Sequence, residues 1–137
     1  TNPPPKAELE GLGTQRTILI VEDSPTNRRV LELMIKRLGF ECGFATDGQE
    51  AIEAFQRNDY PLILMDIQMP RMDGIEVTRR IRQMSAGRAK PAIIGVSADV
   101  MKEDIDRAYA AGMQGYLFKP IRLPDLQEAL MKHLSER

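Results

Sequence analysis

The sequence predicts a single α/β domain in which five parallel strands alternate with five helices to form a doubly wound (βα)5 sheet. Short aliphatic runs without polar alternation recur along the chain, which is typical of strands buried on both faces. A segment with helical spacing of apolar residues comes after each run. This repetition indicates a parallel sheet that helices cover on both sides.

Each strand is predicted from an apolar run and its boundaries. Thr17–Val21 is a continuous run rich in β-branched residues, and Pro61 and Pro91 stand just before two other runs, where a strand can begin. The run at Glu41–Thr46 is weaker and is expected at the edge of the sheet. The predicted strands are Thr17–Val21, Glu41–Thr46, Leu62–Met65, Ala92–Val96 and Tyr116–Phe118.

The helices are predicted from capping residues and apolar spacing. Ser24-Pro25 supplies an N-cap and a proline near the first turn of the first helix, and Gly39 ends it. Val30, Met34 and Leu38 recur four residues apart and are expected to form its apolar face. The predicted helices are Thr26–Leu38, a segment after Asp47-Gly48 with Ala51, Ile52 and Phe55 on one face, Ile75–Met84, Lys102–Ala111 before Gly112, and Pro124–Leu134 with Leu126, Leu130 and Leu134 in line.

Composition excludes several classes of protein. The 137 residues allow one ordinary domain, and a hydrophobic content of 42% is normal for a globular fold. No apolar run approaches the roughly 18 residues that span a bilayer, and the net charge of −1 argues against nucleic-acid binding by bulk electrostatics. Cys42 and His133 are single residues of their types, so an internal disulfide and a zinc site are excluded and a reducing compartment is favoured.

Residues 1–16 differ in composition from the rest of the chain. They contain three consecutive prolines and few aliphatic residues, so we predict a linker or tail there. The domain is expected over residues 17–135. Because the first residue is Thr1 rather than methionine, we also expect a piece of a longer chain.

Polar side chains that can bind ions or take part in a reaction come after the predicted strands. Glu22 and Asp23 follow the first strand, Asp66 ends the third, Ser97 follows the fourth and Lys119 follows the fifth. The functional crevice of a parallel sheet lies at the carboxyl ends of its strands. The topology therefore predicts that three carboxylates, a hydroxyl and an ammonium group meet at one edge of the sheet.

This set of groups suits phosphorylation of an aspartate. Three neighbouring carboxylates repel one another, and a hard divalent cation such as Mg²⁺ relieves the repulsion by binding one or two of them. Lys119 would add a fixed positive charge beside Asp66. Two cations around a carboxylate nucleophile stabilise the charge of a phosphoryl group in transfer.

Four motifs together resemble the receiver domain of two-component response regulators. The motifs are V-E-D at 21–23, M-D-I-Q-M-P-R-M-D-G at 65–74, V-S-A at 96–98 and Y-L-F-K-P at 116–120. The resemblance covers residues 17–135, with every motif in the order of the family. It implies a flavodoxin-like strand order of 2-1-3-4-5.

The resemblance also implies roles for single residues at the site. Asp66 matches the phosphoacceptor, and Ser97 and Lys119 match the hydroxyl and the lysine that assist it. Glu22 and Asp23 match the acidic pair that binds Mg²⁺ (or Mn²⁺) together with Asp66. The backbone carbonyl of Gln68 is implied as a further metal ligand.

Further positions are implied to act once Asp66 is phosphorylated. Ser97, on the loop after the fourth strand, and Tyr116 match the residues of the conformational switch, and Gln68 and Asp99 match positions that tune the lifetime of the phosphoryl group. The family commonly has a cis Lys-Pro bond, which makes Lys119–Pro120 a candidate for this geometry.

The implied function is two-component or phosphorelay signalling in the cytoplasm. The partner would be a histidine kinase or a histidine phosphotransfer protein, whose phosphohistidine donates the phosphoryl group; no nucleic acid or membrane contact is expected of this fragment. The domain would catalyse its own phosphorylation and dephosphorylation. The residues of the first two motifs resemble those of hybrid-kinase receivers more than those of free-standing ones. This resemblance favours a receiver that is part of a hybrid sensor histidine kinase, and the candidate for the whole protein is an inner-membrane sensor. A free-standing response regulator is the alternative.

Three other functions fit the residues less well. A haloacid-dehalogenase-like phosphatase also forms an aspartyl-phosphate, but it needs an acid where Gln68 stands. A flavodoxin-like electron carrier needs a phosphate-binding loop after the first strand, where Glu22 and Asp23 would repel a phosphate. A degenerate receiver that only binds partners is disfavoured because all five chemical positions are filled.

Overall fold

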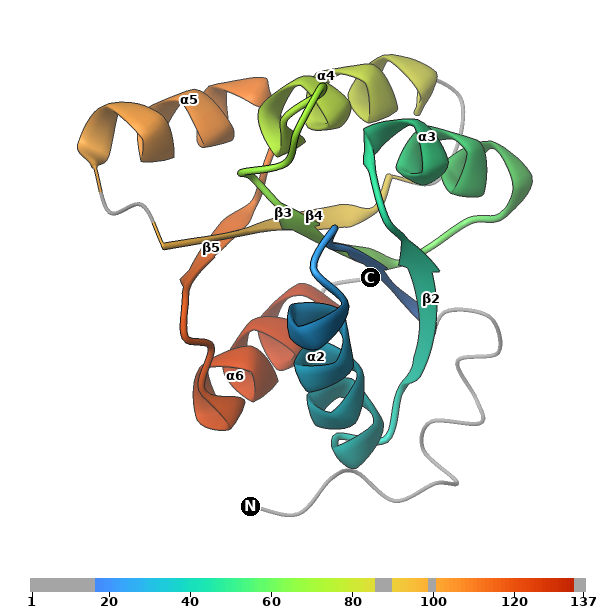
Figure 1. The fold of residues 1–137 in the computed structure, drawn as a ribbon, viewed down its shortest axis with the longest axis vertical. Coiled ribbons are helices and arrows are strands. Elements are labelled where there is room, and N and C mark those ends of the chain that lie inside the picture. The colour runs from blue at the N-terminus through green and yellow to red at the C-terminus, as the bar shows by residue number, and fades with distance from the viewer. Residues whose placement is uncertain (1–16, 86–89, 99–100, 135–137) are drawn as a thin grey trace.

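The computed structural model describes residues 17–85, 90–98 and 101–134, in which strands and helices alternate (Figure 1). The strands are β1 (Thr17–Val21), β2 (Glu41–Ala45), β3 (Leu62–Asp66), β4 (Ala92–Ser97) and β5 (Gly115–Phe118). The helices are α2 (Pro25–Arg37), α3 (Gly48–Arg57), α4 (Gly74–Met84), α5 (Lys102–Ala111) and α6 (Leu123–Leu134). The predicted linker at residues 1–16, Asp99 and Ser135 lie outside the described residues.

The five strands form one parallel sheet in the order β2-β1-β3-β4-β5, which confirms the predicted order. The weak strand β2 is an edge strand, as expected. Val21 pairs with Met65, and Asp66 pairs with Val96. Because these pairs are in register, β1, β3 and β4 end side by side and the residues after them share one edge of the sheet.

The strands bury alternate side chains in two separate cores. Leu19 and Val21 of β1 contribute to the core beneath α3, α4 and α5, whereas Ile18 and Ile20 contribute to the core beneath α2 and α6. Figure 1 shows these two groups of helices on opposite faces of the sheet. Burial on both faces explains why the central strands show aliphatic runs without polar alternation.

Side chains cap three of the helices at their N-termini. The Ser24 hydroxyl accepts from Asn27 N–H at the start of α2, and the carboxylates of Asp47 and Asp73 accept from backbone N–H groups at the starts of α3 and α4. Such caps satisfy donors that have no partner within the helix. The cap predicted at Ser24 is therefore present, and α2 begins at Pro25 directly after it.

The predicted apolar face of α2 is wrong in part. Leu31 and Ile35 are the buried residues of this helix, and Leu38 is buried just after it, but Val30 is 45% exposed. Met34 is only partly buried. The helix is thus turned by one residue relative to the predicted face, which leaves Val30 beside the carboxyl edge of the sheet rather than in the core.

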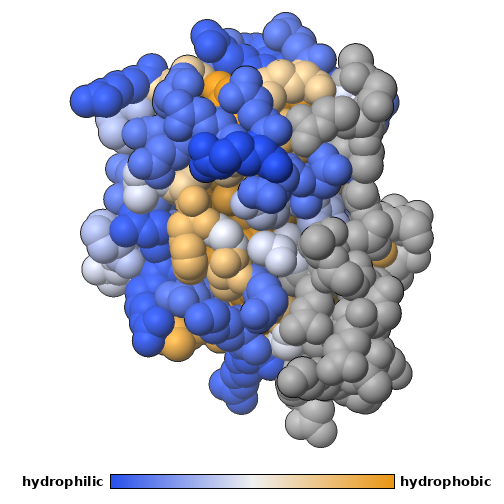
Figure 2. All heavy atoms as spheres, turned by 90° about the vertical axis from the view of Figure 1, so that its right-hand side faces the viewer, coloured by the Kyte–Doolittle hydropathy of each residue, from blue (hydrophilic) through white to orange (hydrophobic). Residues whose placement is uncertain are grey.

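The outer surface is largely hydrophilic on the side that carries β2. Figure 2 shows this side, where hydrophilic residues surround a smaller hydrophobic area. Phe44 of the edge strand is one of the exposed large hydrophobic residues of the described chain. Within the described ranges, every helix is too short or too polar to cross a bilayer.

Candidate functional site

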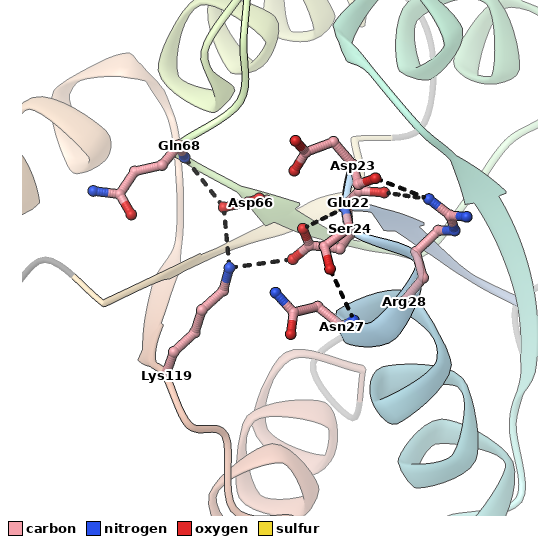
Figure 3. Close-up of polar contacts among 8 residues, drawn as sticks. All are labelled: Glu22, Asp23, Ser24, Asn27, Arg28, Asp66, Gln68 and Lys119. Atoms are coloured by element: carbon pink, nitrogen blue, oxygen red, sulfur yellow. Dashed lines mark hydrogen bonds and ion pairs between the residues drawn. The ribbon is translucent and has the colours of Figure 1, made fainter.

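Three carboxylates meet at the carboxyl edge of the sheet. Glu22 and Asp23 directly follow β1, and Asp66 is the last residue of β3. One oxygen from each of the three side chains lies within 4.8 Å of the others. Glu22 and Asp66 are buried, and Asp23 is exposed; Figure 3 shows how the three side chains lie. The structure therefore brings together the three acids that the sequence placed at one edge.

Lys119 and two backbone amides hold the buried pair of carboxylates. The Lys119 Nζ atom lies 3.2 Å from Glu22 Oε1 and 3.5 Å from Asp66 Oδ1. The N–H of Gln68 donates to Asp66 Oδ1 at 3.1 Å, and the N–H of Ser24 donates to Glu22 Oε2 at 3.1 Å (Figure 3). A single ammonium group thus faces two buried acids, so the described site carries more negative than positive charge.

The pKa of Asp66 reflects its burial first and this excess of negative charge second. Burial, and after it the neighbouring Glu22 carboxyl, raise the pKa of the Asp66 carboxyl to about 7. The Lys119 ammonium and the Gln68 N–H oppose this rise in pKa, because both stabilise the ionised form. Near neutral pH and without a further cation, the Asp66 side chain is therefore close to its midpoint of protonation.

The residues at this edge fit a hard divalent cation. Among the described residues, Glu22 Oε1 is a buried oxygen without a hydrogen bond, since the Lys119 ammonium beside it lacks hydrogen-bond geometry. The three acids offer oxygen ligands only, which Mg²⁺ and Mn²⁺ prefer. An oxygen that is buried and only partly satisfied is where a cation would be most favourable.

The loop after β3 packs closely against Asp66. The N–H of Gly74 donates to the carbonyl of Ile67 at 3.0 Å, and the N–H of Ile67 donates to the carbonyl of Val96 at 3.1 Å. A Cβ at residue 74 would overlap the carbonyl oxygen of Asp66, so glycine is required at this first residue of α4. The sequence shows Gly74 only as the last residue of the motif at 65–74, because its close approach to Asp66 depends on how the preceding loop folds back.

Ser97 lies at the same edge but not on a loop. It is the last residue of β4 and is fully buried, and its carbonyl accepts from the N–H of Lys119 at 2.9 Å. The predicted loop position is thus wrong, because the pairing of β4 with β5 continues through Ser97. This pairing ties the backbone of Ser97 to that of Lys119.

Tyr116 lies one strand further from Asp66 than Ser97 does, in the edge strand β5. Its side chain is partly buried against the core beneath α3, α4 and α5. The ring centroids of Tyr116 and Phe118 are 5.2 Å apart, so the two aromatic side chains lie side by side at this edge. Asp99 falls outside the described residues, and its role stays a prediction.

A partly apolar cavity of about 460 Å³ adjoins the acidic site. Glu22 and Lys119 line one part of it, and Val30, Pro120 and Ile121 line another. The Lys119–Pro120 peptide bond in its wall is cis, as expected. The sequence does not reveal the exposure of Val30 here, because the apolar spacing predicts it on the buried face of the first helix.

Arg28 is a second residue that the sequence did not single out. Its Nη1 atom donates to the carbonyl of Glu22 at 3.1 Å and to the carbonyl of Asp23 at 3.3 Å (Figure 3). The only signal in the sequence is a basic residue five and six positions after the two members of an acidic pair. That signal is weak, since charged residues are common on the exposed side of a helix.

Comparison with known proteins identifies the family of this chain. A family model described as the response regulator receiver domain matches residues 18–131. The chain belongs to this family. It is a receiver domain of two-component phosphorelay signalling, as the motifs predicted. A sensor histidine kinase RcsC of Salmonella typhi is 39% identical over 113 residues, which are 82% of this chain and 12% of that kinase. The receiver thus spans a small part of the relatives it matches.

Two solved structures share the fold of this receiver. The receiver domain of sensor histidine kinase PA1611 from Pseudomonas aeruginosa, solved with a magnesium ion in its active-site cleft, is 37% identical with a TM-score of 0.80; 88% of this chain and 98% of that one are covered. The receiver domain of Ssk1 from Saccharomyces cerevisiae, solved with the histidine phosphotransfer protein Ypd1, gives a TM-score of 0.82 at 27% identity, covering 89% and 90% of the two chains.

Proposed function

We propose that this receiver accepts a phosphoryl group on Asp66 from a phosphohistidine, in a reaction that depends on Mg²⁺ or Mn²⁺. The observation that supports this most strongly is the convergence of Asp66 with two further acids and Lys119 within a few ångström. Glu22, Asp23 and Asp66 would hold the cation, with the backbone carbonyl of Gln68 as a further ligand. A bound cation would neutralise charge on the phosphoryl oxygens.

The protein's own groups supply the rest of the chemistry. An Asp66 carboxylate oxygen attacks phosphorus, the new O–P bond forms, and the P–N bond breaks with its electron pair left on the donor imidazole. Lys119, already 3.5 Å from Asp66 Oδ1, stabilises negative charge as the phosphoryl group arrives. The hydroxyl of Ser97 would donate to a phosphoryl oxygen from the end of β4.

Ser97 and Tyr116 would link phosphorylation of Asp66 to a change at the surface of the domain. A phosphoryl group adds about 1.5 to 2 negative charges next to Lys119 and Ser97. We infer that Ser97 turns toward it and that Tyr116 changes rotamer in response. Because the Ser97 backbone is tied to Lys119, the movement involves the Ser97 side chain and the residues after β4. Gln68, with its exposed side chain, and Asp99 would control how water reaches the phosphoryl group.

The phosphoryl donor is a histidine kinase or a histidine phosphotransfer protein. Val30, which is 45% exposed, and Ile121 form an apolar margin beside the acidic site, where the donor protein would dock. The Ssk1 receiver was solved in complex with such a phosphotransfer protein. We further infer a hybrid sensor histidine kinase as the parent chain and the cytoplasm as the location of this domain.

Replacement of the phosphoacceptor tests the proposal. Asp66→Asn should take up no acid-labile phosphate from acetyl phosphate in Mg²⁺, whereas wild type should be labelled. Asp125→Asn, an exposed aspartate of α6, is the matched control and should be labelled like wild type. Labelling of Asp66→Asn at the wild-type rate would overturn the assignment. Circular dichroism of each variant separates loss of chemistry from loss of fold.

A further inference from the structure

We infer that Arg28 is a positioning residue for the metal site: it fixes the backbone around Asp23 so that the Asp23 carboxylate faces Glu22 and Asp66. The inference rests on the proposed cation site. It concerns a residue that touches no carboxylate of the predicted metal ligands and that acts instead through two peptide carbonyls.

The contacts of Arg28 join the helix to the loop before it. One nitrogen, Nη1, donates to the carbonyls of both Glu22 and Asp23, at 3.1 and 3.3 Å. These two carbonyls lie in the peptide units on either side of the Asp23 Cα atom. Fixing both units fixes the direction of the Cα–Cβ bond of Asp23, and therefore the region its carboxylate can reach (Figure 3).

The three acids differ in how their side chains are held. Glu22 is held by Lys119 and by the N–H of Ser24, and Asp66 is held by Lys119 and by the N–H of Gln68. In the described ranges of the chain, no hydrogen bond or ion pair holds the Asp23 carboxylate, which is also exposed. Its placement therefore depends on the backbone, which Arg28 holds at both carbonyls and which Glu22 Oε2 holds only at the N–H of Ser24.

The position of Arg28 in α2 supports a role beyond helix formation. It lies in the first turns of a helix that begins at Pro25, where the helix dipole disfavours a cation. Arg29, the next residue, instead forms an exposed ion pair with Glu32 at 2.9 Å. Arg28 is directed to the loop and Arg29 to the helix surface, so the two arginines form a natural pair for comparison.

The charge of Arg28 and its positioning role predict opposite effects on metal binding. A guanidinium near three carboxylates repels an incoming cation, so removing its charge alone would tighten Mg²⁺ binding. Removing a group that orients a metal ligand weakens binding instead, typically by about 10-fold or more. The sign of the change therefore distinguishes the two roles.

The test is the Mg²⁺ dissociation constant of the whole protein, measured by isothermal titration calorimetry at constant ionic strength. Arg28→Met should weaken binding by about tenfold, while Arg29→Met should leave it within a factor of about two because Arg29 contacts only the helix surface. Saturating Mg²⁺ should restore the rate of phosphorylation in Arg28→Met, since Asp66 and Lys119 are intact. Thermal unfolding in EDTA reports any loss of fold.

Unchanged or tighter Mg²⁺ binding by Arg28→Met would overturn the inference while leaving the proposed function intact. If Arg28→Met does not fold, Arg28→Lys provides the second variant, because its charge is kept and its shorter side chain reaches the carbonyls less well. Weaker binding by Arg28→Lys supports positioning, and wild-type binding overturns it. Failure of wild-type protein to bind Mg²⁺ at all would instead overturn the metal site itself and this inference with it.

Discussion

The two ends of the sheet differ in how fully their neighbours compensate the charged side chains that lie there. At the carboxyl end, Glu22 and Asp66 share one ammonium group, and Glu22 Oε1 makes no hydrogen bond among the described residues. At the amino end, the Arg82 guanidinium donates to the carbonyls of Gly112 and Pro91 and to the amide oxygen of Gln114, at 2.9, 2.8 and 2.7 Å. The first end has excess charge, and the second has a cation matched by neutral acceptors.

The amino end is built as a structural junction. Gln114 Oε1 also accepts from the N–H of Ile93, so one side chain joins Arg82 of α4 to the start of β4. Gly112 has a φ of 116°, and a Cβ there would press on the Arg82 side chain. Stability and function thus depend on opposite ends of the sheet. At the amino end the hydrogen bonds of Arg82 and Gln114 hold the elements together, and at the carboxyl end the uncompensated acids favour the binding of a cation.

Removal of the ammonium group at the carboxyl end should have the largest effect on function. Lys119→Met is expected to slow phosphorylation of Asp66 by at least about a hundredfold, because a fixed charge at the reacting oxygens is lost. The measurement is the rate of labelling by acetyl phosphate at saturating Mg²⁺. Lys102→Met, which removes an exposed lysine from α5, should react like wild type. A Lys119→Met rate within about threefold of wild type, or about 0.6 kcal/mol, would contradict this role of the lysine.

Removal of the Arg82 guanidinium at the amino end should instead lower the stability of the fold. Arg82→Met is expected to lower the free energy of unfolding by about 2 kcal/mol, because three hydrogen bonds of a partly buried guanidinium are lost. Urea unfolding measures this, with the exposed Arg80→Met of the same helix as control. The Mg²⁺ dissociation constant of Arg82→Met should be that of wild type; a weaker one would mean that the two ends are not separate.

The pH dependence of stability should report the excess charge at the carboxyl end. The pKa of Asp66 is raised to about 7 in the folded protein and is about 4 in an unfolded chain. The group therefore contributes stability that is complete below about pH 4 and is lost as pH rises through about 7. Because Mg²⁺ binds the ionised site, it should raise the melting temperature more at about pH 8 than at about pH 5. Equal Mg²⁺-induced shifts at the two pH values would contradict this.

The smallest effect is expected at the rim of the carboxyl end. The Gln68 side chain is exposed, so its replacement should leave folding and phosphorylation nearly unchanged while it alters autodephosphorylation several-fold. Loss of phosphate from labelled Gln68→Ala and Gln68→Glu measures this, with the exposed Gln83 of α4 as a control position. The same panel at Asp99 tests its predicted role. Identical lifetimes in all variants would show that neither residue tunes the phosphoryl group.

Much of the fold could be predicted because the strands are buried on both faces. Their aliphatic runs, as in Leu62–Asp66, contain no polar residue before the functional one, and the cap predicted at Ser24 falls where α2 begins. The strand order came from the resemblance, since alternating elements do not by themselves fix the order of strands. The structure confirms both the elements and their order.

The buried face of α2 could not be predicted because the helix offers two apolar stripes. Val30 and Met34 form one stripe, Leu31 and Ile35 form the next, and both lead to Leu38. The spacing of apolar residues is the same in each stripe, and only packing against β1 and α6 decides which is buried. The exposed stripe then supplies Val30 to the cavity beside the acidic site.

The acidic site could be predicted in its residues but not in its supporting contacts. Glu22, Asp23 and Asp66 are found because the ends of parallel strands meet at one edge. The role of Arg28 depends on a bond from a side chain to carbonyls five and six residues earlier, which has no spacing rule. The fit of Gly74 against the Asp66 carbonyl likewise depends on how a loop folds back.

The Asp66 carboxylate is held at a cost to stability that a bound cation relieves. Thermal unfolding of wild type and Asp66→Asn at about pH 8, where Asp66 is ionised in the folded protein, measures this cost in EDTA and its relief in Mg²⁺. We predict that Asp66→Asn melts at a higher temperature than wild type in EDTA, because a buried like charge is removed, and that it gains much less from Mg²⁺. A lower melting temperature of Asp66→Asn in EDTA, together with an undiminished gain from Mg²⁺, would show that the carboxylate carries no such cost.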